Sequence, residues 1–517
     1  MGSDKLTIKT KLAFGIGATG EGATNWVFAG LTFFFYNQVL GLSGSLTGLA
    51  VLIAIIFDAI SDPIMGSISD RFISKLGRRH PFMFAAPFPT VIAIYLMFFP
   101  PDGLSEYGLF GWLIFSTILL RLSITLFAVP FPTVLAIYLM FFPPDGLSEY
   151  GLFGWLIIST IMLRLSITLF AVPHLALGAE LSDDYFERSR VMSYNNLFGY
   201  MGVIIMHIFV WFLIFPYFAG EKIGQLYQES YTPIAIFSMA LISLCILASA
   251  YFTKDRVPYL KQPSRNESHI KISDLFKDIY GAVSNKNYAR LLIGMFFLSM
   301  LIGTHETLGI YMGTFFWELS PIQIGWLIIN NIIGYAFGFI LTAKLHQRFD
   351  KPIVIVATVL GLTIFWSASA NIALLGFAPE RGSWELVLMI ICLGSIASAC
   401  GSILHISVMS ALADIADEHE LKTGIRQEGV FYAARAFFSK TSNGIGHVIA
   451  GVALDFIAFP ENAVPGEISA DTIFNLGLID GPFAMIWGLV AVFFYARYKI
   501  TRTSHAEIKR KLLIKNS

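Results

Sequence analysis

Two aspartates four residues apart carry the clearest chemical signal in this sequence. Asp58 and Asp62 lie in the stretch Asp58-Ala-Ile-Ser61-Asp62-Pro63, near the end of a long apolar run. Residues four apart on a helix are neighbours, so both carboxylates face the same way, with the Ser61 hydroxyl beside them. Two carboxylates this close in a medium of low dielectric constant cannot both stay ionised unless positive charge compensates them.

A bound Na⁺ or a proton would supply that charge, so we predict a cation site at Asp58, Ser61 and Asp62. Asp58 and Asp62 would be the metal ligands if the ion is Na⁺. The competing interpretation is a helix-end pair solvated by lipid headgroups, because Pro63 and the loop at Arg71 are near. The depth of Asp58 inside the apolar run favours the cation site.

A lysine in the middle of a later apolar run is the candidate for coupling. Lys440 closes the stretch Phe431-Tyr-Ala-Ala-Arg435-Ala-Phe-Phe-Ser-Lys440. A lysine this deep needs a counter-charge or a neutral state, whereas one nearer the surface would snorkel to the headgroups. Two carboxylates and one ammonium leave one negative charge. One monovalent cation would neutralise it, which suggests 1:1 coupling.

Other polar side chains inside apolar runs are candidates for contact with a substrate. Arg164 suits a cavity role and a structural ion pair equally well. Glu21 suits a cavity role as well as close packing of the helix by its neighbouring glycines. His305 and Glu306 either line a cavity or form a satisfied interior pair. The substrate-binding candidates from these runs are Glu21, Trp26, Arg164, His305 and Glu306.

The elements that must position these residues are membrane-spanning helices. The chain has 517 residues, of which 56% are hydrophobic and 14% charged, whereas a soluble domain is about 25% charged. Lipid must cover the excess apolar surface. Apolar runs of about 18 residues or more are long enough to cross a bilayer as helices. Twelve spans are predicted, at 12–36, 45–67, 81–100, 150–174, 194–216, 232–252, 289–316, 321–343, 352–371, 384–412, 428–455 and 480–497.

A charged stretch separates six of these spans from the other six. We expect an N-terminal six-helix bundle over 1–253, a cytoplasmic central loop over 254–288, and a C-terminal six-helix bundle with a cytoplasmic tail over 289–517. Lys and Arg gather in alternate loops and in the tail, so both termini are expected in the cytoplasm. The loops around Gly77-Arg78-Arg79 and Arg348-Phe-Asp350-Lys351 hold equivalent places, which suggests two six-helix repeats.

A tandem duplication interrupts the first bundle. Phe88–Pro130 and Phe131–Pro173 differ at only three of 43 positions. The apolar stretch Phe131–Phe142 would be about 18 Å long as a helix, too short for a hydrocarbon core of about 30 Å. We therefore expect an extra duplicated segment of the third and fourth spans that is accommodated badly. The native fourth helix should be the second copy, because only that copy continues into Pro173-His174.

Several functional classes are excluded by composition and pattern. The formal net charge is zero, which argues against a nucleic-acid partner. The three cysteines lie in apolar runs and are interpreted as reduced packing residues. We find no metal-ligand cluster and no nucleophile–base arrangement in the sequence, so a membrane enzyme is not expected, and neither is a cofactor other than the coupling ion.

The helix around the two aspartates resembles a known family. Phe57-Asp58-Ala-Ile-Ser61-Asp62-Pro63-Ile-Met-Gly66 is similar to the second-helix signature of the glycoside–pentoside–hexuronide:cation symporters, the family typified by melibiose permease. Further similar segments are Lys11–Gly17, Gly77–Pro81, Val172–Glu180 and Asp417–Gly429. The resemblance implies a major facilitator fold with cation binding by Asp58 and Asp62 and with Lys440 close by. Thr168 matches a fourth-helix threonine near that cation site.

The sequence departs from the family pattern where melibiose transporters bind sugar. Their first-helix aspartate is Gly22 here, beside Glu21; a fourth-helix aspartate is Ala171; and a fifth-helix arginine is Asn196. Asn196 is therefore a further substrate-binding candidate by position only. The resemblance supports the cation site better than a galactoside site.

We thus expect a secondary symporter that couples sugars or glycosides to Na⁺ or H⁺ by alternating access. Its partners would be a small-molecule substrate and the lipid bilayer, and we expect a monomer. Its location would be the plasma membrane, which is the inner membrane if the source is bacterial. The alternatives are a symporter of lysolipids or other amphiphiles and a non-transporting product of a duplicated gene.

Overall fold

The structure, a computed structural model, describes residues 6–72, 74–84, 143, 147–182, 184–220, 223–260, 285–424 and 428–516. Within these ranges every regular element is a helix, as predicted. The long helices are α1 (Ile8–Phe34), α2 (Gly44–Arg71), α7 (Glu149–Glu180), α8 (Tyr185–Ile208), α10 (Tyr231–Thr253), α12 (Lys286–Tyr311), α14 (Ile328–Arg348), α15 (Lys351–Leu374), α16 (Trp384–Thr423), α17 (Glu428–Phe456) and α19 (Ala484–Tyr495).

Shorter helical pieces extend or connect the long helices. The α-helical pieces are α3 (His80–Phe84), α9 (Phe215–Tyr217), α13 (Pro321–Trp326), α18 (Ala470–Leu478) and α20 (Arg502–Asn516). Four π-helical turns are η1 (Phe35–Val39), η2 (Phe209–Ile214), η6 (Met312–Phe316) and η7 (Ile479–Phe483), and the 3₁₀ turns are η3 (Gly224–Leu226), η4 (Gln228–Ser230) and η5 (Lys254–Tyr259).

Eleven of the twelve predicted spans correspond to helices in the described ranges. The third, 81–100, lies outside the described residues after Phe84. Nine of the helices described are long and apolar enough to cross a membrane. The last span differs from its prediction: the helical path runs from Ala470 through η7 to Tyr495, so it begins ten residues earlier than position 480.

Local sequence explains where several helices begin and end. Ser148, Asn285 and Ser383 cap the amino-terminal ends of α7, α12 and α16, because their side-chain oxygens accept backbone N–H groups that lack a partner within the helix. The long helix α16 ends at Gly424, whose φ of 76° is the left-handed conformation that glycine adopts without strain.

The chain forms two compact units. Unit 1 contains Met1–Leu42 and Ile53–His269, and unit 2 contains Ser43–Leu52 and Ile270–Ser517. Helix α2 therefore belongs to both units. In unit 2, the Asp455 carboxylate of α17 accepts the backbone N–H groups of Gly44 and Ser45, at 2.8 Å each. The carboxylate thereby caps the amino-terminal end of α2, where such an anion is favoured.

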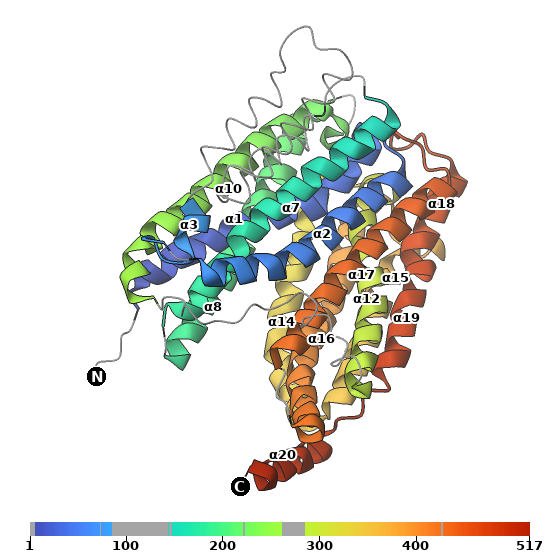
Figure 1. Cartoon of the computed structure of the whole chain (residues 1–517). Helices are drawn as coiled ribbons and strands as arrows, with labels where there is room; N and C mark the ends of the chain where they lie inside the picture. The colour runs from blue at the N-terminus through green and yellow to red at the C-terminus, as the bar shows by residue number, and fades with distance from the viewer. Residues whose placement is uncertain are drawn as a thin grey trace. The chain divides into compact units, whose positions relative to one another are not determined.

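Helix α1 is the centre of unit 1 and packs against α8 and α10 (Figure 1). Its crossing with α8 depends on glycine: a Cβ atom at Gly22 would lie 2.1 Å from the carbonyl oxygen of Gly199, and one at Gly202 would lie 2.1 Å from that of Thr19. Lipid offers little hydrophobic drive for helix association, so such close backbone approach supplies the contact.

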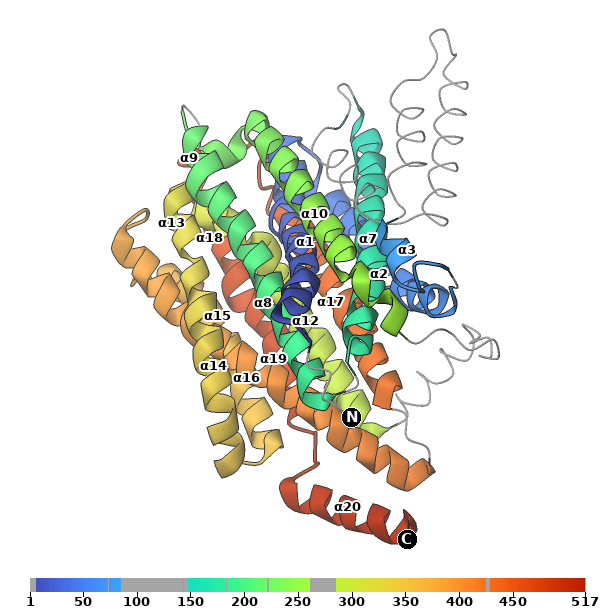
Figure 2. The ribbon, with the colours of Figure 1, turned by 90° about the vertical axis from the view of Figure 1, so that its left-hand side faces the viewer.

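Unit 2 repeats this arrangement with α12 and α17. A Cβ atom at Gly303 would lie 2.3 Å from the carbonyl oxygen of Asn443. In each unit, then, the first and fifth spans cross closely at glycines. The short helix α20 follows the last span at one end of unit 2 (Figures 1 and 2) and contacts α16.

Both units also carry an ion pair between the loop after the second span and the fourth helix. In unit 1, Arg78 and Arg79 contact Glu180 of α7, at 2.9 and 2.7 Å. In unit 2, Lys351 contacts Asp414 of α16 at 2.5 Å. The loops that the sequence placed in equivalent positions thus make equivalent contacts.

The first copy of the duplication, 88–130, lies outside the described residues, as does the short stretch Phe131–Phe142. The second copy contributes the beginning of α7, which continues through Pro173 to Glu180 without a break. The prediction that the second copy runs on as the fourth helix is therefore confirmed.

Deletion of residues 88–130 tests how the duplication is accommodated. The deletion joins Pro87 to Phe131, keeps the local sequence Pro-Phe-Pro-Thr-Val, and leaves one third span of about 20 residues, enough to cross the bilayer. We expect a higher yield of folded protein and a higher Tm, measured on the purified chain. Lower yield together with lower Tm would mean that the extra segment is an integral part of the fold.

Candidate functional site

The two aspartates of the sequence signature meet a single hydroxyl group in unit 1. Helix α2 carries Asp58 and Asp62 one turn apart, and α7 presents Thr168 to both of them. The Thr168 Oγ1 atom lies 2.9 Å from Oδ1 of Asp58 and 2.8 Å from Oδ1 of Asp62. Asp58 and Thr168 are buried, with 4% and 1% of their surfaces exposed, and Asp62 is half-buried.

One hydroxyl group cannot satisfy both carboxylates. Thr168 has one hydrogen to donate, and an ionised carboxylate can only accept. One of the two short oxygen–oxygen contacts therefore needs a further proton or a cation. The Ser61 hydroxyl lies 3.4 Å from the Thr168 hydroxyl and also donates to the Asp58 carbonyl oxygen, at 3.1 Å.

Arg164 supplies positive charge to this cluster from one turn earlier on α7. Its Nη1 atom lies 3.8 Å from Oδ2 of Asp58, and it donates to the side chain of Asn25 at 3.3 Å. Its guanidinium group also lies over the Phe28 ring, 3.8 Å from the ring centroid, a favourable arrangement for a cation. Of the two roles open to Arg164 from sequence, the structure shows the ion pair.

The remaining candidates of unit 1 lie on α1 and α8. Glu21 and Trp26 are half-buried on α1, and Trp26 packs edge-on against His207, with ring centroids 5.8 Å apart. Position 22 has no room for a side chain, because Gly22 touches Gly199. An aspartate here, as in melibiose transporters, would not fit this crossing. Asn196 is exposed on α8.

The candidates of unit 2 form two contacts on α12. Glu306 is exposed and accepts a hydrogen bond from the Asn443 side chain of α17, at 3.1 Å. Lys440 is half-buried three residues before Asn443 on the same helix. Because Lys440 belongs to unit 2 and the paired aspartates to unit 1, its coupling role stays a prediction.

The other α12 contact involves an acid that sequence reasoning missed. The Nδ1 atom of His305 lies 2.7 Å from Oδ1 of Asp480, and Asp480 is only 3% exposed. Asp480 sits in η7, a π-helical turn of the kind often found at functional sites. The sequence does show an ionisable residue there, directly before Gly481-Pro482. Because the predicted span began at position 480, Asp480 was interpreted as the end of a helix and not as a residue inside the membrane.

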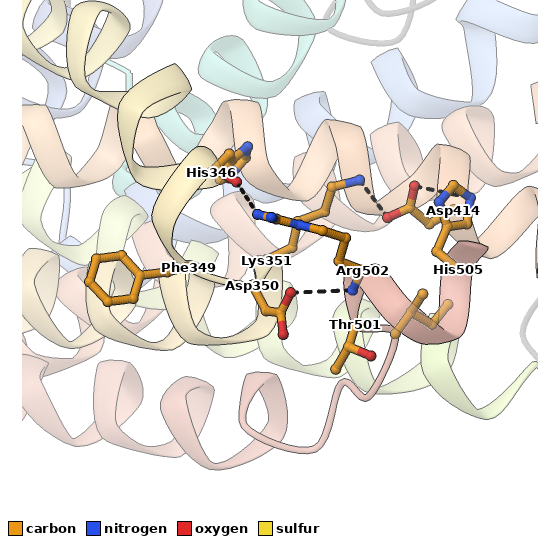
Figure 3. Close-up of a pocket in the computed structure, with 9 residues that line it drawn as sticks. His346, Phe349, Asp350, Lys351, Asp414, Thr501, Arg502 and His505 are labelled. Atoms are coloured by element: carbon orange, nitrogen blue, oxygen red, sulfur yellow. Dashed lines mark hydrogen bonds and ion pairs between the residues drawn. The ribbon is translucent and has the colours of Figure 1, made fainter. Parts of the chain in front are cut away.

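A third cluster of charged side chains closes one end of unit 2 (Figure 3). A cavity of about 140 Å³ is lined there by nine residues, including His346, Lys351, Asp414, Arg502 and His505. Arg502 of α20 donates to the His346 carbonyl oxygen at 2.6 Å, and His505 contacts Asp414 at 3.4 Å. These contacts join α20 to α14 and α16, so we describe the cluster as the attachment of α20 to unit 2.

The described residues contain no group of three or more His, Cys, Asp or Glu side chains that could hold a metal ion. An ion at the unit 1 cluster would therefore be held by the two carboxylates and neighbouring hydroxyl oxygens. Oxygen ligands of this kind suit hard cations.

Comparison with known proteins identifies the family of this chain. A family model described as MFS/sugar transport protein matches residues 13–133 and 130–502, so that its two matched segments meet at the junction of the duplicated copies. The chain belongs to this transporter family. It is a polytopic membrane transporter with the major facilitator fold, and it is not an enzyme.

The transporter is similar to bacterial symporters over almost its whole length. It is 24% identical to the uncharacterized symporter YnaJ of Bacillus subtilis, over 95% of this chain and 92% of that one. It is 20% identical to the putative glycoside/cation symporter YagG of Escherichia coli, over 98% and 95% of the two chains. A crystal structure of a D-xylose-proton symporter shares the fold, with a TM-score of 0.58, 15% identity, and coverage of 95% and 98%.

The Asp58–Arg164 pair can be tested through the stability of the transporter. Arg164→Gln removes the positive charge beside the buried Asp58 carboxylate, and we expect it to cost on the order of 3 kcal/mol and to lower Tm. Asp58→Asn should cost less, because Asp62 still balances Arg164 in that variant. The double variant should lose less than the two single variants together. As a control, Lys422→Gln breaks only the exposed pair with Glu418 and should change little. Additive losses would contradict direct pairing.

The attachment of α20 gives a second test. Arg502→Gln removes the guanidinium group that donates to the end of α14, so the amides of α20 should exchange about tenfold faster with solvent deuterium. Lys511→Gln, which removes an exposed pair with Glu507 within α20, is the matched control. Equal exchange in the wild type and in Arg502→Gln would show that other contacts hold the helix.

Proposed function

We propose that this transporter is a symporter of sugars or glycosides, driven by one monovalent cation bound at Asp58, Asp62 and Thr168. The observation that carries the proposal is the position of the Thr168 hydroxyl between two carboxylate oxygens, where a single hydrogen serves two acceptors. A Na⁺ ion or a proton bound there supplies the missing positive charge.

Charge balance gives the stoichiometry. Asp58 and Asp62 contribute two negative charges and Arg164 one positive charge, so the formal charges of these three side chains sum to one negative charge. One monovalent cation balances that charge. In this account Arg164, which belongs to the same unit, takes the charge-balancing part that the sequence assigned to Lys440. Lys440, on α17, keeps the coupling role that the sequence predicts for it.

Coupling follows from the cost of an uncompensated charge in the membrane. Without the cation, closure of protein around the cluster would bury a net negative charge, at a cost of several kcal/mol. With the cation bound, closure buries a neutral cluster and avoids this cost. Cation binding therefore shifts the population of conformers toward the closed one. The substrate binds the neutral form and moves with the ion by alternating access.

Sugar or glycoside is the substrate class that the surrounding side chains favour. Half-buried aromatic and polar groups occur in both units: Trp26 beside His207, and Trp366 beside His305, with ring centroids 4.8 Å apart. Aromatic faces pack on the apolar side of a sugar ring, and amide, imidazole and carboxylate groups bond its hydroxyls. The relative YagG, described as a putative glycoside/cation symporter, favours the same substrate class.

Location and topology are part of the proposal. The alternation of Lys and Arg between loops favours cytoplasmic termini. The exposed basic helix α20, with Lys509, Arg510 and Lys511, fits the cytoplasmic face, where anionic lipids attract basic segments. In a bacterial source the membrane would be the inner membrane.

Uptake by proteoliposomes tests the proposal. A panel of glycosides, pentoses, hexuronates and lysophospholipids first identifies the substrate, and initial rates are then measured against Na⁺, Li⁺ and H⁺. Asp58→Cys, Asp62→Cys and Thr168→Val should reduce cation-stimulated uptake at least about tenfold, equivalent to 1.4 kcal/mol. Lys440→Val should change the cation dependence more than the surface expression.

Two matched variants serve as controls. Thr168→Ser keeps the hydroxyl and should keep most of the stimulation. Glu149→Gln removes an exposed acid from the beginning of the same helix, α7, and should leave the rates unchanged. Unchanged cation stimulation in both aspartate variants would rule out the site, and transport of lysophospholipids alone would rule out the substrate class.

A further inference from the structure

Four acidic residues are buried in the described part of the chain, and their ion-pair partners differ in kind. Asp58 pairs with Arg164, Glu187 with Lys11, Asp414 with Lys351, and Asp480 with His305. Arginine and lysine keep their charge at physiological pH. Histidine is the side chain that ordinarily gains or loses its charge in that range. The buried carboxylate of Asp480 is thus balanced by a group able to release its proton.

The geometry leaves one side of this pair open. His305 turns Nδ1 toward Asp480, at 2.7 Å, so the other ring nitrogen, Nε2, is not used by that bond. The His305 side chain is 24% exposed, whereas that of Asp480 is 4% exposed. A proton can therefore reach the imidazole while the carboxylate stays shielded.

The surroundings favour a positive imidazole. The Trp366 ring of α15 lies beside His305, and an indole ring attracts a nearby cation. The adjacent acid on α12 is Glu306. On α17, which packs against α12, the charged or titratable groups include Arg435, Lys440, His447 and Asp455, and His447 bonds Thr307 at 2.6 Å.

We propose that His305 and Asp480 form a second ion site, in unit 2, which takes up and releases one proton during transport. The inference rests on the proposed transport activity but not on which cation binds at Asp58. It assigns to unit 2 an ion site of its own, separate in sequence from the carboxylate pair of unit 1.

The proton balance is simple. In the released state the imidazole is neutral, Nδ1–H donates to the ionised Asp480, and the pair carries one negative charge. A proton from water adds to Nε2, and the pair becomes neutral without breaking the Nδ1–H bond. Because the two groups share one proton-dependent charge, they titrate as a unit.

A measurement without substrate tests this assignment. The purified full-length protein is titrated in nanodiscs between about pH 5 and 9, and both bound protons and tryptophan emission are recorded. A protonated imidazole quenches a neighbouring indole. The contribution of Trp366, measured as the difference in emission between the wild type and Trp366→Phe, should therefore fall as the pH falls. His305→Gln and Asp480→Asn should each remove about one proton per chain and abolish the quenching.

The double variant makes the test sharp. If His305 and Asp480 act as one site, His305→Gln/Asp480→Asn should also lose about one proton, not two. His447→Gln removes a buried histidine from the same unit and should leave the Trp366 signal intact. A Trp366 signal that does not change with pH in the wild type, or that persists in Asp480→Asn, would overturn the proposal.

A fold-preserving variant covers the case in which Asp480→Asn does not fold. His305→Lys converts the pair into a permanent ion pair like those of the other three buried acids. It should remain folded and lose the pH-dependent Trp366 signal. In uptake assays His305→Lys should flatten the pH dependence of the rate, whereas Asp58→Cys should lose the cation stimulation and keep the pH-dependent Trp366 signal. Failure of the proposed symport and failure of the second site are thereby distinguished.

Discussion

A carboxylate buried among membrane helices must be neutralised, because an uncompensated charge in a medium of low dielectric constant costs several kcal/mol. In this protein each buried acid meets its partner on a different helix of the same unit. Glu187 joins α8 to α1, Asp414 joins α16 to α15, and Asp480 joins η7 to α12. The same requirement that makes these acids costly therefore specifies which helices lie together. At Asp58 and Asp62 two carboxylates share the Thr168 hydroxyl group, and this is where we propose that the coupling ion binds.

Close backbone contact provides the other part of the framework. Glycines at the α1–α8 and α12–α17 crossings bring the main chains within contact distance, so dispersion rather than hydrophobic transfer holds these pairs. A crossing of this kind excludes side chains from the interface. The contrast with melibiose transporters at Gly22 follows from it: a position that carries an acid there is committed to packing here, and polar recognition must come from other positions on the helices.

Sequence alone indicated much of the fold and part of the site, and the reasons are local. Long apolar runs predicted the helices, because the length and hydropathy of a span are properties of one continuous stretch of chain. Asp58 and Asp62 share one turn and were found for the same reason. The partnership of His305 with Asp480 joins residues 175 positions apart, and no pattern along the chain measures such a separation. The sequence identified Arg164 as a charged residue inside an apolar run. Its pairing with Asp58 could not be predicted, because it depends on how α2 packs against α7.

Helix α2 is shared between the two units, and this has a mechanical consequence. Its 28 residues make a rod about 42 Å long. One end is fixed in unit 2 by the Asp455 carboxylate, and the part from Ile53 onward, which includes both aspartates, belongs to unit 1. A continuous helix resists compression and twisting, so a rotation of α2 that reorients Asp58 and Asp62 is transmitted to its fixed end. The bending stiffness of the five residues between Leu52 and Asp58 then sets how closely the direction of the aspartate-bearing part follows the fixed end.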